Sequence, residues 1–129
     1  MSQENVTVVL RSLEAFDHDE EAWLSAADPA IEWYPIEDGH IPSVGHEAIV
    51  GVRRRWLEAW EDFRVDVEEI TDGGDSVVAS LHVSGQGKGS GVEVDLHVHV
   101  HFKLQDGKVV YLYEHEDKGQ ALEAAGLRE

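Results

Sequence analysis

Residues 92–116, VEVDLHVHVHFKLQDGKVVYLYEHE, alternate between apolar and polar side chains along two segments that meet at Asp106-Gly107. A period of two is typical of β-strands that present one face to a core and the other face to water. The dipeptide Asp-Gly favours the tight turn of a β-hairpin. We therefore predict two antiparallel strands, over 92–104 and 108–116, that share one apolar face.

The residues before this hairpin continue the pattern. Phe63, Val65 and Val67 alternate with charged residues, and a further alternating run at 76–84 follows a turn. The glycine-rich segment 85–91 is typical of a flexible hairpin connection, since it lacks the Gly-Lys-Ser/Thr and the following helix of a phosphate-binding loop. These residues therefore predict a meander of four antiparallel strands.

The N-terminal part of the chain has helical spacing instead. A capping box at Asp17 and Glu20 predicts a second helix over about 18–27. This helix is expected to end at Asp28-Pro29, because the residue before a proline avoids the helical region. The apolar residues that predict the first helix are Val6, Val9, Leu10, Leu13 and Phe16.

The order of all elements predicts the fold class. We expect a short strand over 31–34, a loop over 35–45, a third helix over about 46–61, and a last helix that Asp117 caps and Gly126 ends. Helices that precede a meander favour an α+β fold. We therefore predict one curved antiparallel sheet with the helices packed on one face.

Composition and charge exclude several function classes. A chain of 129 residues predicts a single domain over 1–129, and the absence of cysteine excludes disulfides, thiolate nucleophiles and Cys-ligated metals. The net charge of −17 repels phosphate backbones and anionic lipids, so we expect no nucleic-acid or membrane partner. Neither a membrane span nor a signal peptide is evident, and the expected location is the cytoplasm.

Short motifs along nearly the whole chain point to a family when they are taken together. They lie at residues 31–33, 45–49, 60–65, 73–78, 87–92, 106–110 and 121–127. In combination they resemble the SnoaL-like branch of the nuclear transport factor 2-like superfamily. The resemblance implies a cone-shaped α+β fold, usually dimeric, with an internal pocket between the curved sheet and the helices. This superfamily contains ketosteroid isomerases, polyketide cyclases, limonene-epoxide hydrolases and members that only bind or scaffold.

The site of ketosteroid isomerases is not retained at the matching positions. Its general base falls on Tyr34, and its two oxyanion-hole residues fall near Leu10 and Val100. Leucine and valine cannot donate a hydrogen bond to an enolate. The resemblance therefore does not imply that particular chemistry.

Two other branches of the superfamily both point to Glu114. The last acid of the Asp-Arg-Asp set in epoxide hydrolases falls on Glu114, while its arginine and first aspartate fall near Ser80 and His82. The acidic base of SnoaL-like cyclases falls near Glu114 as well, and their histidine falls near Val100. The resemblance thus implies that this chain keeps one carboxylate of these sites, Glu114, and that His82 is its partner from a shifted position.

The residues themselves make Glu114 a candidate base. It shares strand parity with Val110 and Leu112, so it faces the apolar side, where desolvation raises the pKa of a carboxyl. We predict Glu114 as the base, with His82 on the inner face or Tyr34 as its partner. The alternatives are a solvated or structurally paired acid at 114 and a hydrogen-bonded core histidine at 82.

Large aromatic and apolar residues supply the wall of the expected pocket. Trp33 and Tyr34 are neighbours on one strand, so at most one of them faces the pocket. We predict a small-molecule pocket protein that performs cofactor-independent acid–base isomerase, cyclase or hydrolase chemistry on a small apolar carbonyl or epoxide compound. The alternative is a non-catalytic ligand-binding or dimerisation module. The predicted substrate-binding residues are Trp33, Trp56, Trp60, Val100, Phe102 and Leu112.

His97, His99 and His101 recur at every second residue, so a strand places them on one face, opposite the apolar face. Together with Tyr111 and Tyr113, they predict a homodimer surface on the outside of the sheet. A plain solvated face is one alternative. The other alternative is a site for zinc, nickel or copper, because imidazole binds these metals. We predict no metal-binding residues.

Overall fold

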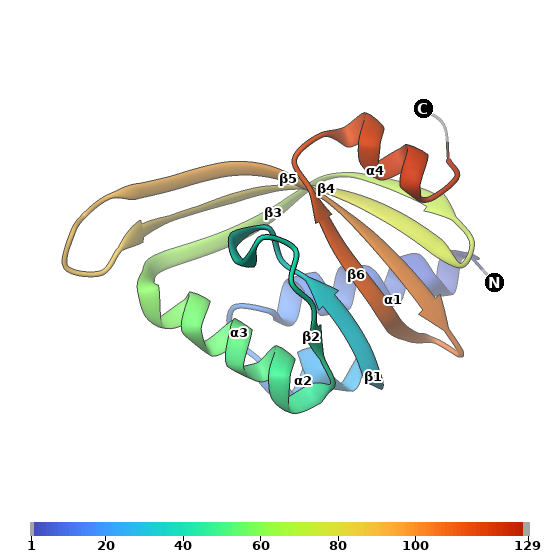
Figure 1. Cartoon of the computed structure of the whole chain (residues 1–129), viewed down its shortest axis with the longest axis horizontal. Helices are drawn as coiled ribbons and strands as arrows, with labels where there is room; N and C mark the ends of the chain where they lie inside the picture. The colour runs from blue at the N-terminus through green and yellow to red at the C-terminus, as the bar shows by residue number, and fades with distance from the viewer. Residues whose placement is uncertain (1, 128–129) are drawn as a thin grey trace.

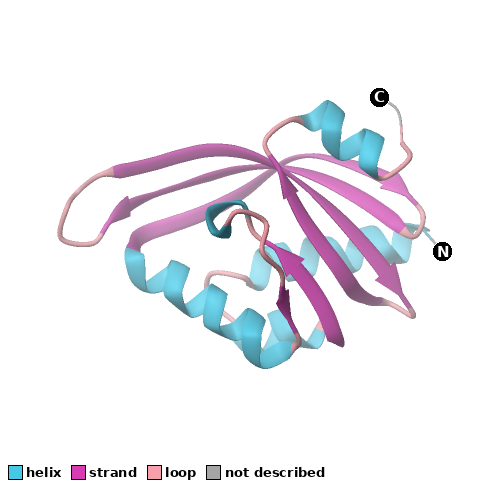
Figure 2. Cartoon of the chain, viewed as in Figure 1, coloured by secondary structure: helices cyan, strands magenta, loops and turns pink. Residues whose placement is uncertain are grey.

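Figure 1 shows the computed structural model, which describes residues 2–127. Helices and strands follow one another with short connections, as the colours of Figure 2 show. The elements are α1 (Ser2–Ala15), α2 (Glu20–Ser25), β1 (Ala27–Tyr34), the 3-10 turn η1 (Ile36–Asp38), β2 (Ser43–Val44), α3 (His46–Ala59), β3 (Trp60–Gly73), β4 (Ser76–Gly87), β5 (Glu93–Gln105), β6 (Lys108–His115) and α4 (Lys118–Ala124).

The strands form one curved sheet in the order β2-β1-β6-β5-β4-β3. The predicted meander is confirmed, because β3, β4, β5 and β6 pair antiparallel with their neighbours in sequence. Asp106 and Gly107 turn the β5–β6 hairpin with positive φ angles of 52° and 75°. One pair differs from the expectation of an antiparallel sheet, since β1 runs parallel to β6. The chain enters β1 from the helical layer and not through a hairpin.

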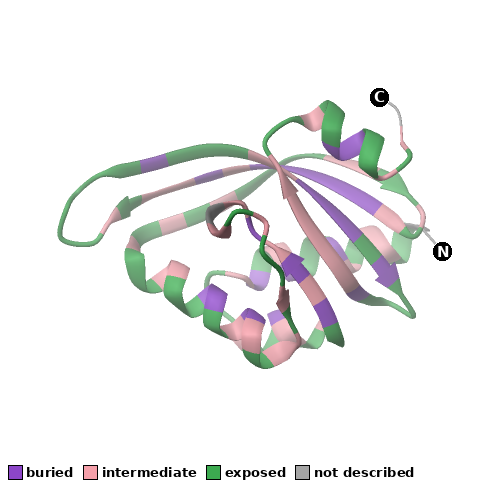
Figure 3. Cartoon of the chain, in the orientation of Figure 1, coloured by how far each residue is buried: buried purple, intermediate pink, exposed green. Residues whose placement is uncertain are grey.

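The helices lie on both sides of this sheet, in unequal amounts. α1, α2 and α3 cover one face, and α4 lies on the other (Figure 1). The main core fills the space under the first three helices, and its buried positions gather on the central strands (Figure 3). On the opposite face, Ala121 and Leu122 of α4 pack on Val78 of β4. The predicted α+β fold with a curved sheet is confirmed, and α4 is the element that covers the second face.

Several predicted boundaries were wrong near the helices. Asp19, and not Asp17, caps α2 by accepting a hydrogen bond from the backbone N–H of Ala22 at 3.1 Å. Asp28-Pro29 lies inside β1, where the pairing register with β6 shifts between Ala27 and Glu32. Such irregular strand positions tolerate the missing proline N–H.

The ends of α3 and β4 also differ from the prediction. α3 ends at Ala59, so Trp60 begins β3. β4 continues through Gly85 to Gly87, and a Cβ atom at Gly85 would lie 3.2 Å from the carbonyl oxygen of Glu61. The caps of α4 are confirmed, because Asp117 accepts from the N–H of Gln120 at 3.0 Å and Gly126 has a φ of 73°.

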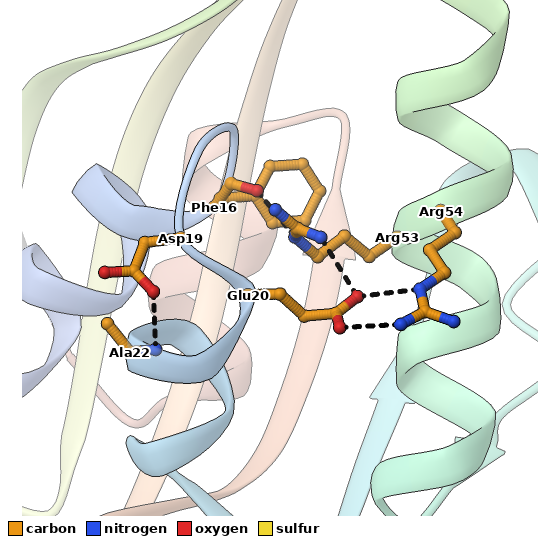
Figure 4. A network of polar contacts seen from close by, with 6 residues as sticks. All are labelled: Phe16, Asp19, Glu20, Ala22, Arg53 and Arg54. Carbon is orange, nitrogen blue, oxygen red and sulfur yellow. Dashed lines mark hydrogen bonds and ion pairs between the residues drawn. The ribbon is translucent and has the colours of Figure 1, made fainter.

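An arginine network fastens the α1–α2 corner to α3 (Figure 4). Arg53 is 7% exposed and donates to the carbonyl oxygen of Phe16 at 2.7 Å and to Glu20 at 3.1 Å. Its guanidinium carbon lies 5.8 Å and 5.7 Å from the ring centroids of Phe16 and Trp23. Arg54 binds the same Glu20 carboxylate through two hydrogen bonds of 2.9 Å and 2.8 Å. This network fixes two aromatic rings of the inner face.

Among residues 2–127, no helix has the length and apolar character that crossing a membrane requires.

Candidate functional site

A cavity of about 580 Å³ lies between the concave face of the sheet and the helical layer. Its wall is predominantly apolar and is built from both layers. The apolar lining residues are Leu13, Phe16, Trp23, Trp33, Ile36, Trp56, Phe63, Val65, Leu81, Val83, Leu96, Val98, Val100, Phe102 and Leu112. The volume and the lining are those of a small-molecule site.

Glu114 places a carboxyl group on this apolar wall. It lies on β6, directly opposite Val100 of β5, so both side chains face the cavity. One carboxyl oxygen, Oε2, accepts a hydrogen bond from the indole Nε1–H of Trp33 at 2.8 Å, and Oε1 accepts one from the backbone N–H of Ile36 at 3.0 Å. The parallel pairing of β1 with β6 makes the first bond possible, because Trp33 lies opposite Leu112 and shares its face.

Burial raises the pKa of the Glu114 carboxyl above its ordinary value. The hydrogen bonds from Ile36 and Trp33, and the nearby charge of His40, oppose this effect without cancelling it. The His40 ring also lies with its Nε2 2.6 Å from the backbone oxygen of Glu114. A carboxyl with a raised pKa is a better proton acceptor than an ordinary glutamate, and two hydrogen bonds fix its position.

Comparisons with known proteins agree with this geometry. The family model for the SnoaL-like domain matches residues 9–112. The chain belongs to the SnoaL-like domain family. No curated protein sequence gives a significant match.

Solved structures share the fold of this SnoaL-like domain. A proposed SnoaL-like polyketide cyclase from Jannaschia sp. CCS1 superposes with a TM-score of 0.79 at 23% identity, over 99% of this chain and 95% of the other. TerC, co-crystallised with polyporic acid, superposes with a TM-score of 0.76 at 23% identity, over 95% of this chain and 97% of TerC. An LEH-like epoxide hydrolase from M. tuberculosis superposes with a TM-score of 0.76 at 17% identity, over 96% of this chain and 92% of the other. At these identities the likeness shows the fold.

Most of the predicted pocket residues of the SnoaL-like domain line the cavity. Trp33 faces inward, as do Trp56, Val100, Phe102 and Leu112. The prediction for Trp60 was wrong. Because α3 ends at Ala59, two residues before the predicted end, Trp60 starts β3 and packs on Trp56, with 5.4 Å between ring centroids, outside the lining.

The predicted partnership of His82 with Glu114 was also wrong. The inward residues of β4 are Leu81 and Val83, so His82 faces the outside of the sheet. There its Nε2 lies 2.7 Å from Asp95 Oδ1. The prediction relied on the shared parity with Val78, an apolar residue that packs under α4 on the outer face.

Tyr34 lies on the outer face as well, which excludes it as a direct partner of Glu114 in the cavity. Strand alternation turns it away from Trp33, as expected for neighbouring residues. Its hydroxyl donates to Glu32 Oε1 at 2.8 Å, and its ring lies 5.3 Å from the rings of both Tyr111 and Tyr113.

Four polar groups that border the cavity were not anticipated, and two of them, His97 and Glu116, belong to exposed residues. Ser12 of α1 is 6% exposed and lines the cavity, which adds a hydroxyl to an otherwise apolar helix face. Ile36 contributes only its backbone N–H to Glu114. Helical spacing groups Ser12 with the polar side of α1, and a backbone donor leaves no mark in a sequence. The sequence therefore carried no signal for the Ser12 hydroxyl or for the backbone N–H of Ile36.

The three histidines of β5 occupy three different environments on the outer face. His97 is exposed and its Nδ1 lies 3.0 Å from Glu68 Oε1, whereas His99 Nδ1 lies 2.8 Å from the Ser80 hydroxyl. His101 is only 1% exposed. Because α4 packs against β4, β5 and β6, the row is not a continuous exposed surface.

Burial of His101 makes the stability of the fold depend on pH. Burial lowers the pKa of His101 from 6.5 to about 4, helped by the charges of Lys103 and His115. Between pH 6.5 and pH 4, His101 is protonated in the unfolded chain and neutral in the folded chain. The free energy of unfolding is therefore highest above pH 6.5 and decreases as the pH falls toward 4. This pKa shift can change the free energy of unfolding by up to about 3 kcal/mol. His101→Leu should remove this component, which urea unfolding of both proteins at pH 7.5 and pH 4.5 measures. An unchanged difference between the two pH values would contradict the assignment.

Proposed function

We propose that this SnoaL-like chain binds a small apolar carbonyl or epoxide compound in the cavity and uses Glu114 as a general base. The observation that carries the proposal is one carboxyl, fixed by Trp33 and Ile36, on the wall of an apolar cavity of about 580 Å³. Its raised pKa supports proton transfer near neutral pH. Two structures with the same fold are described as a proposed SnoaL-like polyketide cyclase and as an LEH-like epoxide hydrolase, which supports the choice of these compound classes.

The simplest reaction of this kind is proton transfer next to a carbonyl. The Glu114 carboxylate removes a proton from the α-carbon, and the C–H electron pair forms the C=C bond of an enolate while the C=O electrons move to oxygen. The carboxylic acid then returns the proton to carbon, so no net oxidation occurs and no cofactor is consumed. The Ser12 hydroxyl lines the same cavity and is a donor suited to the carbonyl oxygen.

With an epoxide, Glu114 would instead remove a proton from water. The resulting hydroxide attacks an epoxide carbon, and the C–O bond breaks. The ring oxygen takes a proton from solvent water to give a diol, and Glu114 releases its proton to solvent. Cofactor independence and a cytoplasmic location stay predictions from the sequence.

The second candidate is a non-catalytic ligand-binding module. It is favoured by the contacts of Glu114 itself, since both carboxyl oxygens accept hydrogen bonds that connect β6 with Trp33 of β1 and with Ile36 of η1. In that case the carboxyl is a structural link, and the cavity binds its ligand mainly through its apolar wall.

Deuterium exchange of a model ketone distinguishes the two candidates. We would incubate 2-tetralone with the full chain in D₂O at neutral pD, follow the loss of its α-proton signals by NMR, and measure binding by the quenching of tryptophan fluorescence. The proposed function predicts saturable binding and exchange faster than in buffer or with an equal concentration of acetate. Saturable binding without faster exchange supports the binding module and contradicts the catalytic proposal.

We also propose that a second copy of the chain docks on the outer face of β1 and β6. This face carries the half-buried rings of Tyr34, Tyr111 and Tyr113, and His40 stacks on Tyr113 with 4.5 Å between centroids. Aromatic side chains of this kind are enriched at interfaces. The exposed His97 was part of the predicted surface, and the buried His101 is not available to a partner.

A charge on this face is expected to prevent dimerisation. Tyr113→Glu should halve the mass measured by light scattering after size exclusion, because the new carboxylate would be desolvated between two copies. Leu10→Glu is the control, since it places the same charge on an exposed apolar residue of α1, which is 40% exposed. A wild-type chain that is already monomeric, or a control that dissociates equally, would contradict the proposal.

A further inference from the structure

A second group of chemistry-bearing side chains lies on the outer face of the sheet, where His97 also borders the cavity. Asp66 of β3, His82 of β4 and His97 of β5 form one cross-strand row, because His82 lies directly opposite both of the others. Asp95 lies one outward position from His97 on β5, and Glu68 approaches from the bulge in β3 between Val67 and Glu69. Three strands thus bring two imidazoles and three carboxylates together.

The distances in this group are those of potential ligands around one point. His82 Nε2 lies 2.7 Å from Asp95 Oδ1, and His97 Nδ1 lies 3.0 Å from Glu68 Oε1. The two imidazole rings stack with 4.8 Å between centroids and 14° between planes. One ligand atom from each of His82, Asp95 and His97 lies within 4.8 Å of the others.

We propose that His82, Asp95 and His97 form a site for a divalent transition cation of the zinc class, with Glu68 as the fourth protein ligand. Zinc binds imidazole nitrogen and carboxylate oxygen at about 2.0–2.2 Å, so two ligands of one ion lie about 3.3 Å apart. The His82–Asp95 distance needs to open slightly to reach that value, and the His97 ring needs to approach. Both movements are available to side chains at an exposed surface.

The charge around the group favours a cation. The carboxylates of Asp95 and Glu68 contact the two imidazoles, and Asp66 lies directly opposite His82 on β3. Imidazole must be neutral to bind a metal ion, so these carboxylates supply the negative charge that offsets the charge of the cation. The donors also select the metal: two nitrogens and carboxylates suit zinc, nickel or copper better than calcium or magnesium.

This site differs from the metal alternative that the histidine row offers. Only His97 of that row is exposed, since His99 is half-buried and His101 is 1% exposed. A directly opposite pair on neighbouring strands lies close together, at about 4.5–5.5 Å between Cα or Cβ atoms. His82 from β4 therefore completes the pair with His97, and His99 and His101 are engaged with Ser80 and Ser76 instead.

Calorimetric titration of the metal-free full chain with ZnCl₂, at pH 7.5 in a buffer that does not bind metal, tests the site. We expect saturable binding of one Zn²⁺ per chain. His82→Ala and His97→Ala should each weaken it at least about tenfold, and Asp95→Asn should weaken it while keeping the shape of the side chain. Binding should also weaken at pH 5.5, because protons compete with the metal ion for imidazole nitrogen.

The matched control is His18→Ala. His18 also belongs to an exposed histidine–carboxylate pair, with 3.0 Å between its Nε2 and Glu14 Oε1, but that pair lies on α1. It should leave the affinity for Zn²⁺ unchanged. Non-saturable uptake, wild-type affinity in folded His82→Ala or Asp95→Asn, or an equal loss in His18→Ala would each overturn the proposal. Circular dichroism of every variant verifies the fold, and Asp95→Asn decides the matter if an alanine variant unfolds.

Discussion

Replacing Glu114 with glutamine is expected to slow the exchange of 2-tetralone α-protons at least about a hundredfold, the usual contribution of a positioned general base. Glutamine has nearly the same shape and cannot accept the proton. Binding of the ketone should change little, because the apolar wall provides most of the contact. The measurement is the exchange rate at saturating ketone, which separates the loss of the proton-transfer step from a loss of affinity.

The same substitution should also affect the free energy of unfolding. Both oxygens of Glu114 accept from donors, so the amide NH₂ of glutamine must face either Trp33 Nε1–H or the N–H of Ile36. An unmatched pair of buried donors costs about 1–3 kcal/mol. Trp33→Phe removes one donor, so Glu114→Gln should be less destabilising in that background. Exchange should stay slow in the double variant. Wild-type exchange in folded Glu114→Gln would exclude the carboxyl as the base.

Arg53→Ala is expected to lower the free energy of unfolding by about 2–4 kcal/mol. The substitution leaves the carbonyl oxygen of Phe16 without its donor and removes the guanidinium from the rings of Phe16 and Trp23. Glu20 keeps its two bonds to Arg54, so no isolated charge is left behind. The loss is therefore mainly one of packing and of one buried hydrogen bond. Urea unfolding at pH 7.5 measures it.

The neighbouring arginine provides the control. Arg55 pairs with Asp38 at 2.8 Å, but its side chain is 62% exposed, so Arg55→Ala should cost less than about 1 kcal/mol. Arg53→Met, which keeps most of the volume, should lie between the two alanine variants. Equal effects at positions 53 and 55 would show that burial of Arg53 contributes nothing.

Local patterns in the sequence were sufficient to predict the half of the fold that consists of hairpins. The alternation in residues 92–116 placed Val100, Phe102, Leu112 and Glu114 on one face, and these four side chains line the cavity. The turn at Asp106-Gly107 does not set this register alone, because the β5–β6 pairing shifts by one residue between Lys103 and Leu104. The parity of Glu114 with Leu112 along β6 is what indicated its face. The carboxyl at the centre of the site was therefore predictable.

The errors have non-local causes. The apolar side chain of Val78 indicated that Val78 and His82, which share a face of β4, point toward the cavity. In the structure α4 packs on Val78 from the outer side of the sheet, so His82 lies on the outer face. The bond between Trp33 and Glu114 joins residues 81 positions apart and depends on the parallel β1–β6 pair. The α3–β3 junction has no turn residues, and its position could not be read to the residue.

Titration of the Glu114 side-chain carboxyl carbon by ¹³C NMR tests the central claim most directly, with the assignment taken from Glu114→Gln. The carboxyl should titrate above the ordinary glutamate pKa of 4.5, and its midpoint should move when 2-tetralone occupies the cavity. A midpoint at or below 4.5 that saturating ketone leaves unchanged would contradict the account, because the carboxyl would then be neither desolvated nor part of a binding site.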